Sequence, residues 1–146
     1  FLPMLVINVY FALRNQERSL LNDFAAVLQF CLIVFVSYHI GGGSHFQIAF
    51  ALFAICFLYF VGTVFYVKTM IRKKNNRKFY ILSIFYHILL LLLTMLFYPL
   101  YLIIPVIILL MRAIIAPKTG LSVMKSGIFE LFNSLLMMIS IIMIYS

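Results

Sequence analysis

A few ionisable and amide side chains lie inside otherwise apolar segments, and these are the residues that could do chemistry. An ionisable group in hydrocarbon is costly, so it usually faces a bundle interior or a water-filled cavity. Glu130 and Asn133 are three residues apart and therefore share one face of a helix. We predict a polar pocket among the helices. Its candidate residues are Asn22, Asp23, His87, Arg112, Glu130 and Asn133.

Two interpretations of these residues stay open. In one, Asp23 and Glu130 form ion pairs with arginines and fix the packing of the helices. In the other, the residues line a cytoplasm-facing pocket that binds a lipid or small amphiphile, because helix bundles build ligand sites between their helices. His87 by itself is more typical of a hydrogen-bonded interior histidine than of a ligand or proton relay. The arginines available for pairing are Arg14, Arg18 and Arg112.

The usual metal and nucleotide motifs do not occur in the sequence. Cys31 and Cys56 are isolated cysteines without CxxC or Cys/His spacing. The glycines at 41–43 lack the Lys-Ser/Thr of a phosphate loop, and no acidic cluster suits magnesium. We therefore expect neither a metal nor a cofactor.

The composition identifies the environment of the elements that must position these residues. Of 146 residues, 66% are hydrophobic and 10% are charged, against about 45–50% and about 25% in soluble domains. A soluble domain of this size could not cover so much apolar surface. The net charge of +8 does not indicate nucleic-acid binding, because the basic residues are distributed between long apolar runs. The chain is therefore predicted to be an integral membrane protein.

Five runs are long enough to cross a hydrocarbon core as helices. The fourth is short and contains Pro105, and Pro99 leaves no polar loop before it, which indicates a tight hairpin or a broken helix. Residues 1–13 are too short to span alone and begin with Phe in an apolar stretch, so we interpret the chain as the C-terminal part of a longer protein. The prediction is an all-α polytopic transmembrane helix bundle, residues 1–146 forming one membrane-embedded domain. Its spans are 20–40, 46–67, 79–98, 100–115 and 121–145, after a truncated N-terminal half-helix.

The basic residues alternate along the connections between these runs. All eleven Lys and Arg residues fall in or beside the first, third and fifth connections, while the Gly41–His45 and Tyr98–Pro99 turns contain none. By the positive-inside rule the basic connections are cytoplasmic, which directs the C-terminus to the outer face. The expected partners are membrane lipids, with anionic headgroups on the cytoplasmic side. The candidate headgroup or phosphate contacts are Arg14, Arg18, Lys68 and Arg72.

Several segments also carry a resemblance to a known family. They are residues 8–23, residues 62–72 with the stretch Tyr-Val-Lys-Thr-Met-Ile-Arg, Tyr86-His87, Arg112-Ala113 and residues 127–134. In this order they resemble the YwiC-like family of bacterial integral membrane proteins. Members are longer at the N-terminus, which agrees with the fragment interpretation. The family is uncharacterised, so the resemblance implies a multi-pass bacterial cytoplasmic-membrane protein rather than a reaction.

A weaker, architectural resemblance is to UbiA-type membrane prenyltransferases. It rests on a Tyr-x-x-x-Arg segment closing one helix, an Asn-Asp helix start and a polar loop after the next long helix. That family binds magnesium and an allylic diphosphate through aspartate-rich loops, whereas residues 68–78 contain no acid. We expect no catalytic machinery in this chain. The alternatives are a prenyltransferase-like enzyme whose acidic motif lies in the missing N-terminal part, and a small transporter.

Overall fold

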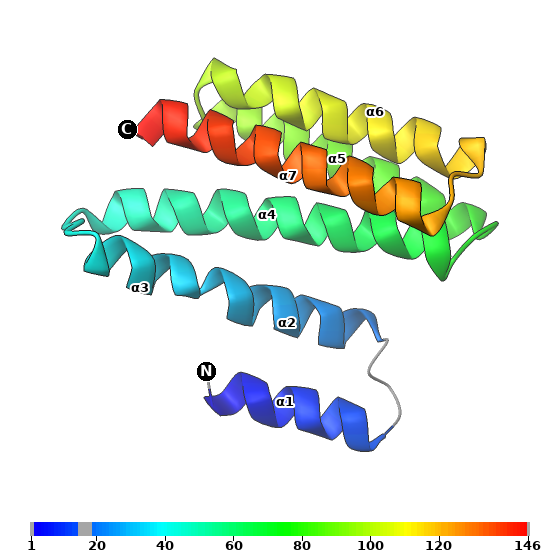
Figure 1. Ribbon diagram of the computed structural model, residues 1–146, viewed down its shortest axis with the longest axis horizontal. Helices are drawn as coiled ribbons and strands as arrows, with labels where there is room; N and C mark the ends of the chain where they lie inside the picture. Colours follow the sequence, from blue (N-terminus) through cyan, green and yellow to red (C-terminus); the bar gives the residue numbers. More distant parts are fainter. Residues whose placement is uncertain (1, 15–18, 146) are drawn as a thin grey trace. The chain divides into compact units, whose positions relative to one another are not determined.

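The computed structural model describes residues 2–14 and 19–145, and all of its regular elements are helical (Figure 1). No strand occurs among these residues. In chain order the elements are α1 (Leu2–Leu13), α2 (Leu20–Cys31), α3 (Ile33–Ile40), α4 (Phe46–Ile71), α5 (Arg77–Phe97), the 3₁₀ turn η1 (Leu100–Leu102), α6 (Ile103–Thr119) and α7 (Val123–Tyr145).

Five of the described segments are long and apolar enough to cross a membrane, and they coincide with the five predicted spans. The all-α, multi-pass prediction is thus confirmed. Two spans are slightly shorter at one end, since α5 ends at Phe97 and α7 begins at Val123. Three extend further than predicted: α4 continues to Ile71, α5 begins at Arg77, and the fourth span continues to Thr119. In each case the helix extends through Lys or Arg residues, whose long apolar stems suit a helix end near a membrane surface.

One predicted span is interrupted. Residues 20–40 form α2 and α3, separated by Leu32, which is itself in the right-handed helical region. The backbone N–H of Leu32 still donates to the Leu28 carbonyl, at 3.0 Å. The interruption is therefore a local change in the hydrogen-bond ladder and not a loop.

Local residue types explain where several of the helices begin and end. The side chains of Ser19 and Asn76 each accept a hydrogen bond at 3.1 Å, from the backbone N–H groups of Asn22 and Phe79 respectively, and so cap α2 and α5. Gly120 follows α6 with a φ of 64°, in the left-handed region that favours glycine. Pro105 is the third residue of α6, where its missing N–H has no helical acceptor to lose. The fourth span therefore tolerates it.

The chain divides into two compact units, Phe1–Val64 and Phe65–Ser146. In the first, α1 packs against α2, and the side-chain amide of Asn8 donates to Gln29 at 3.1 Å. Aromatic rings hold α3 to the first part of α4, with Phe35 and Phe53 centroids 5.1 Å apart. The prediction of one domain over 1–146 stays a prediction.

In the second unit α5 and α6 form a tight hairpin, and α7 packs against α6 and η1 (Figure 1). The Tyr80 hydroxyl of α5 donates to the Ile114 carbonyl of α6 at 2.9 Å. The last part of α4 joins this unit through Phe65, whose ring centroid lies 5.0 Å from that of Tyr86. Large apolar side chains such as Leu96 and Phe132 are exposed, while Thr94 is buried. Apolar side chains outward and polar ones inward is the pattern expected of a unit surrounded by lipid.

Candidate functional site: a buried arginine and a basic pocket

Arg112 is the centre of the polar interior of the second unit. Its side chain is 1% exposed and forms an ion pair with Glu130 of α7, whose side chain is 19% exposed. The guanidinium carbon also lies 4.0 Å from the ring centroid of Tyr66, in a cation–π contact. Three helices thus converge on one guanidinium. This ion pair is one of those that the packing interpretation allowed for Glu130, which named Arg14, Arg18 and Arg112 as possible partners.

Other polar groups in this interior have unused hydrogen-bonding capacity. His87 Nδ1 lies 2.7 Å from the Ser83 carbonyl oxygen, and because a carbonyl only accepts, Nδ1 carries the hydrogen. In the neutral ring Nε2 is then an acceptor. It has no partner among the described residues, and neither have the amide atoms of Asn133 nor Nε and Nη2 of Arg112. Buried polar groups normally find partners, so each of these atoms can still form a hydrogen bond with water.

The structure brings Arg112 and Glu130 into contact, and it buries His87 completely within α5. Asn133 lies three residues after Glu130, on the same helix, and is 2% exposed. Asn22 and Asp23 belong to the first unit, where both are half-buried in the first turn of α2. A pocket uniting all six residues stays a prediction.

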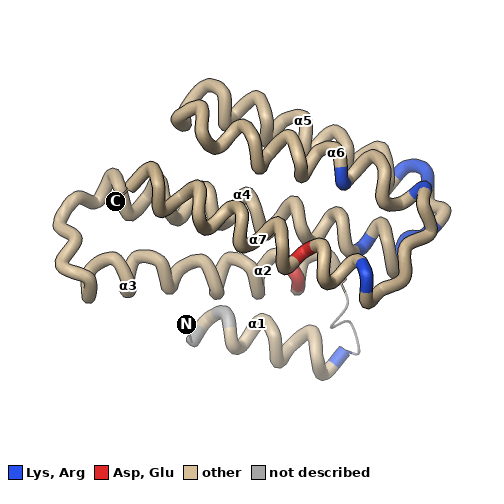
Figure 2. The backbone as a smooth tube through the Cα atoms, turned by 45° about the horizontal axis from the view of Figure 1, so that its top comes forward, with Lys and Arg blue, Asp and Glu red and all other residues tan. Residues whose placement is uncertain are grey.

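A pocket of about 230 Å³ lies at the end of the second unit where α4 leads into α5 and α6 into α7. Figure 2 shows basic positions gathered toward this end of the helices. None of the described residues lining the pocket is acidic. The cationic lining residues are Lys73, Lys74, Arg77 and Lys118, and the others include Thr69, Met70, Asn76, Tyr80, Pro117 and Leu121.

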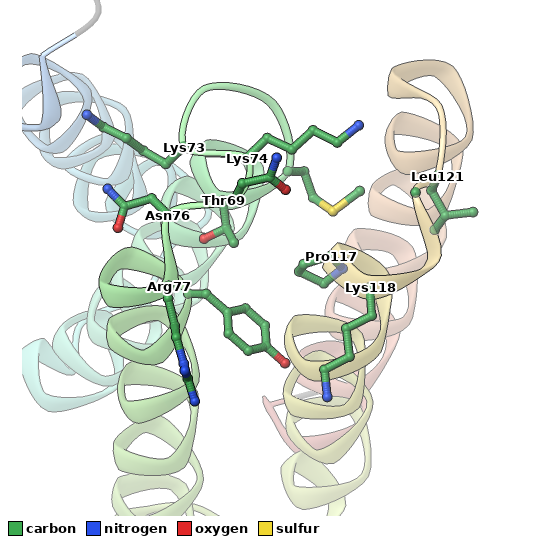
Figure 3. Close-up of a pocket in the computed structure, with 12 residues that line it drawn as sticks. Thr69, Lys73, Lys74, Asn76, Arg77, Pro117, Lys118 and Leu121 are labelled. Atoms are coloured by element: carbon green, nitrogen blue, oxygen red, sulfur yellow. The ribbon is translucent and has the colours of Figure 1, made fainter.

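The cationic groups surround the pocket and do not converge on one point. Figure 3 shows Arg77 on the α5 side and Lys118 on the α6 side, with the ammonium groups of Lys73 and Lys74 directed away from each other. The Lys118 ammonium lies 6.0 Å from the Tyr80 ring centroid. The positive charges surround a pocket whose apolar walls include Met70, Tyr80 and Leu121. Such a pocket is better suited to binding an anionic headgroup than to coordinating a single small ion tightly.

Of the residues predicted from the sequence to contact headgroups, those that the structure describes do not line the basic pocket. Lys68 is 6% exposed and Arg72 is exposed, and neither lines the pocket. Arg14 directly follows α1 in the first unit, and its guanidinium carbon lies 4.7 Å from the Tyr10 ring centroid. Arg18 lies outside the described residues.

A second hollow, of about 320 Å³, runs along α6 on the side of α7. Its walls are almost wholly apolar and include Ile108, Met111, Ile115 and Phe129, and we call it the α6–α7 groove. Arg112 also lines it, and Leu121 lines both this groove and the basic pocket.

Sequence reasoning did not identify the lining of the basic pocket. Within residues 68–78 it named Lys68 and Arg72 as headgroup contacts and none of the basic residues that line the pocket. It also did not associate Lys118 with this segment. The sequence did contain the information needed to group them. The third and fifth connections were predicted to lie on one side of the membrane, which brings Lys73, Lys74 and Lys118 to the same end of the helices.

Within residues 2–14 and 19–145, no group of three or more His, Cys, Asp or Glu residues could hold a metal.

Comparison with known proteins gives the family. The family model described as "YwiC-like protein" matches residues 1–38. Over 73 residues, half of this chain, the sequence is 45% identical to the uncharacterised protein YwiC of Bacillus subtilis. The chain belongs to the YwiC-like family. The resemblance noted from the sequence is thereby confirmed.

A second relative extends the similarity over most of the chain. An uncharacterised protein of Haemophilus influenzae is 30% identical over 129 residues, which is 88% of this chain. The two alignments cover 30% and 54% of these relatives, so the chain spans about half their length or less. No solved structure matches the chain, and the UbiA-type resemblance stays a prediction.

Proposed function

We propose that this YwiC-like chain binds an anionic amphiphile, such as a lipid with a phosphate headgroup, in the basic pocket at one end of its second unit. The observation that carries this proposal is the lining itself. Lys73, Lys74, Arg77 and Lys118 surround a hollow of about 230 Å³ that also contains Tyr80 and no described acidic residue. Basic pockets between membrane helices commonly bind anionic headgroups.

The location of the pocket supports an amphiphile as the ligand. Lys73 and Lys74 follow α4, and Lys118 lies in the last turn of α6, so the positive charge stands where apolar helices end. An anionic headgroup placed there has apolar helix surface directly beside it. A free polar ion would gain nothing from that surface.

The proposal includes an orientation. In a bacterial cytoplasmic membrane the pocket would face the cytoplasm, because basic connections are retained on that side. The C-terminus would then be directed to the outer face. The chemistry that this lining supports is recognition of negative charge, and no feature of the described residues favours the prenyltransferase-like enzyme or the transporter.

The experiment measures binding of phosphatidic acid and of phosphatidylcholine to the purified protein in micelles. Each Lys or Arg near a lipid surface contributes about 1 kcal/mol, so the triple variant Lys74→Gln/Arg77→Gln/Lys118→Gln should weaken phosphatidic acid binding by roughly a hundredfold. Phosphatidylcholine binding should be weak and unchanged.

A control variant of equal charge distinguishes the pocket from the general surface. Arg72→Gln/Lys78→Gln/Lys125→Gln removes three exposed basic side chains that do not line the pocket. It should retain most of the phosphatidic acid affinity. Equal losses in the two triple variants, or no preference of the unaltered protein for phosphatidic acid, would refute the proposal.

A further inference from the structure

The basic pocket and the α6–α7 groove meet at Leu121. The residue lines both hollows, in the connection between α6 and α7. The last residues of α6 are also divided between them, since Pro117 and Lys118 line the pocket while Ala116 and Thr119 line the groove. One hollow therefore begins where the other ends.

The groove extends away from the basic end along the helix. Its α6 lining runs from Thr119 back to Ile108, which is about 16 Å at the rise of an α-helix. The groove thus has the length and the apolar walls to take a hydrocarbon chain, and its volume of about 320 Å³ is of the right order for one chain. Phe129 of α7 lies on its other side.

The charged residue in this lining does not oppose an apolar occupant. Arg112 is paired with Glu130 and stacked against Tyr66. Its side chain is 1% exposed, so little of its charge faces the groove. A hydrocarbon chain there would not be placed against an unpaired ion.

We infer that the two hollows form one bipartite site, in which the anionic headgroup occupies the basic pocket and a hydrocarbon chain of the same molecule lies in the α6–α7 groove. This inference rests on the proposed function and specifies its ligand as a long-chain anionic amphiphile. Leu121 marks the point where headgroup passes into chain.

The test compares hexanoyl and oleoyl lysophosphatidic acid, which share one phosphate headgroup and differ in chain length. The oleoyl compound should bind the unaltered protein at least tenfold more tightly. Ile115→Trp, which fills the groove, should abolish that difference while leaving hexanoyl binding unchanged. Ile104→Trp is the matched control, because Ile104 is an exposed isoleucine of α6 outside the groove, and it should change neither affinity.

The outcomes separate the two proposals. Failure of both compounds to bind the unaltered protein would overturn the proposed function. Equal binding of the two, or a chain-length advantage that survives in Ile115→Trp, would overturn only the bipartite site. Retained hexanoyl binding shows that a variant is folded, and Met111→Phe replaces Ile115→Trp if that variant does not fold.

A photoreactive group at the chain end gives a measurement that needs no substitution. On irradiation, the oleoyl analogue should cross-link to groove residues far from the basic pocket, such as Ile108 and Met111. Cross-links elsewhere on the chain, or to a second copy of the protein, would contradict the inference.

Discussion

At the scale of single residues, the pairing of Arg112 with Glu130 is the contact on which the interior of the second unit depends. The guanidinium is almost fully buried, so its charge is stabilised by Glu130 and by the Tyr66 ring rather than by water. Sequence reasoning named both partners from their cost in hydrocarbon. It could not place Tyr66, because a tyrosine in an apolar helix gives no sequence signal of stacking on a cation.

We expect Glu130→Leu to lower the free energy of unfolding by about 3–5 kcal/mol, because it leaves a buried arginine without its charge partner. The double variant Arg112→Met/Glu130→Leu should recover most of this loss, since it removes both charges. Denaturant unfolding in micelles measures the effect.

The control for this pair is Lys125→Leu, which removes an exposed charge from the same helix and should change stability by about 0.5 kcal/mol or less. If the double variant were as unstable as Glu130→Leu, the loss would come from packing at position 130 and not from the unpaired charge.

At the scale of elements, the five spans could be predicted because each is an apolar run bounded by charge, Gly or Pro. The interruption at Leu32 could not, since it lies in an unbroken run of apolar residues without Gly or Pro. The extension of α4 to Ile71 was missed for a related reason, because the predicted span ended at Val67, before Lys68, which the structure buries. Hydropathy locates helices, whereas the bounds depend on capping and on packing.

Two glycines near the α6–α7 connection should respond oppositely to the same substitution. Gly120 has a φ of 64°, where a Cβ is strained although nothing lies within 4 Å. Gly120→Ala should therefore destabilise the protein by about 1–2 kcal/mol. Gly127 lies within α7 with open space around it, so Gly127→Ala should stabilise by about 0.5–1 kcal/mol. The thermal unfolding midpoint should fall in the first variant and rise in the second, and a shift of equal sign would contradict this account.

At the scale of the whole molecule, the distribution of Lys and Arg predicted that the α4–α5 and α6–α7 connections lie on the same side of the membrane. Residues from both connections line the basic pocket. Six polar residues were predicted to share a pocket, and within the second unit the structure joins Arg112 with Glu130. The grouping of distant residues depends on which helices become neighbours, and a single sequence contains little information on that.

The membrane orientation can be tested with single cysteines in a Cys31→Ala/Cys56→Ala background. Lys74→Cys lies in the α4–α5 connection and should react with a membrane-impermeant maleimide only after the cells are opened, because basic connections are cytoplasmic. Ser44→Cys, at the other end of α4, should react in intact cells. The reverse pattern would overturn the orientation, and labelling of both from one side would contradict a membrane-spanning α4.

The turn between α3 and α4 also bears on how the protein enters the membrane. Residues 41–45 contain no Lys, Arg, Asp or Glu, and the Tyr38 ring packs so closely on Gly43 that a Cβ there would clash with it. In the proposed orientation this turn is carried through the hydrocarbon during insertion, where each charged residue would add about 2.5–3.5 kcal/mol. A compact, uncharged turn keeps that translocation barrier low, so α3 and α4 can insert together as a hairpin.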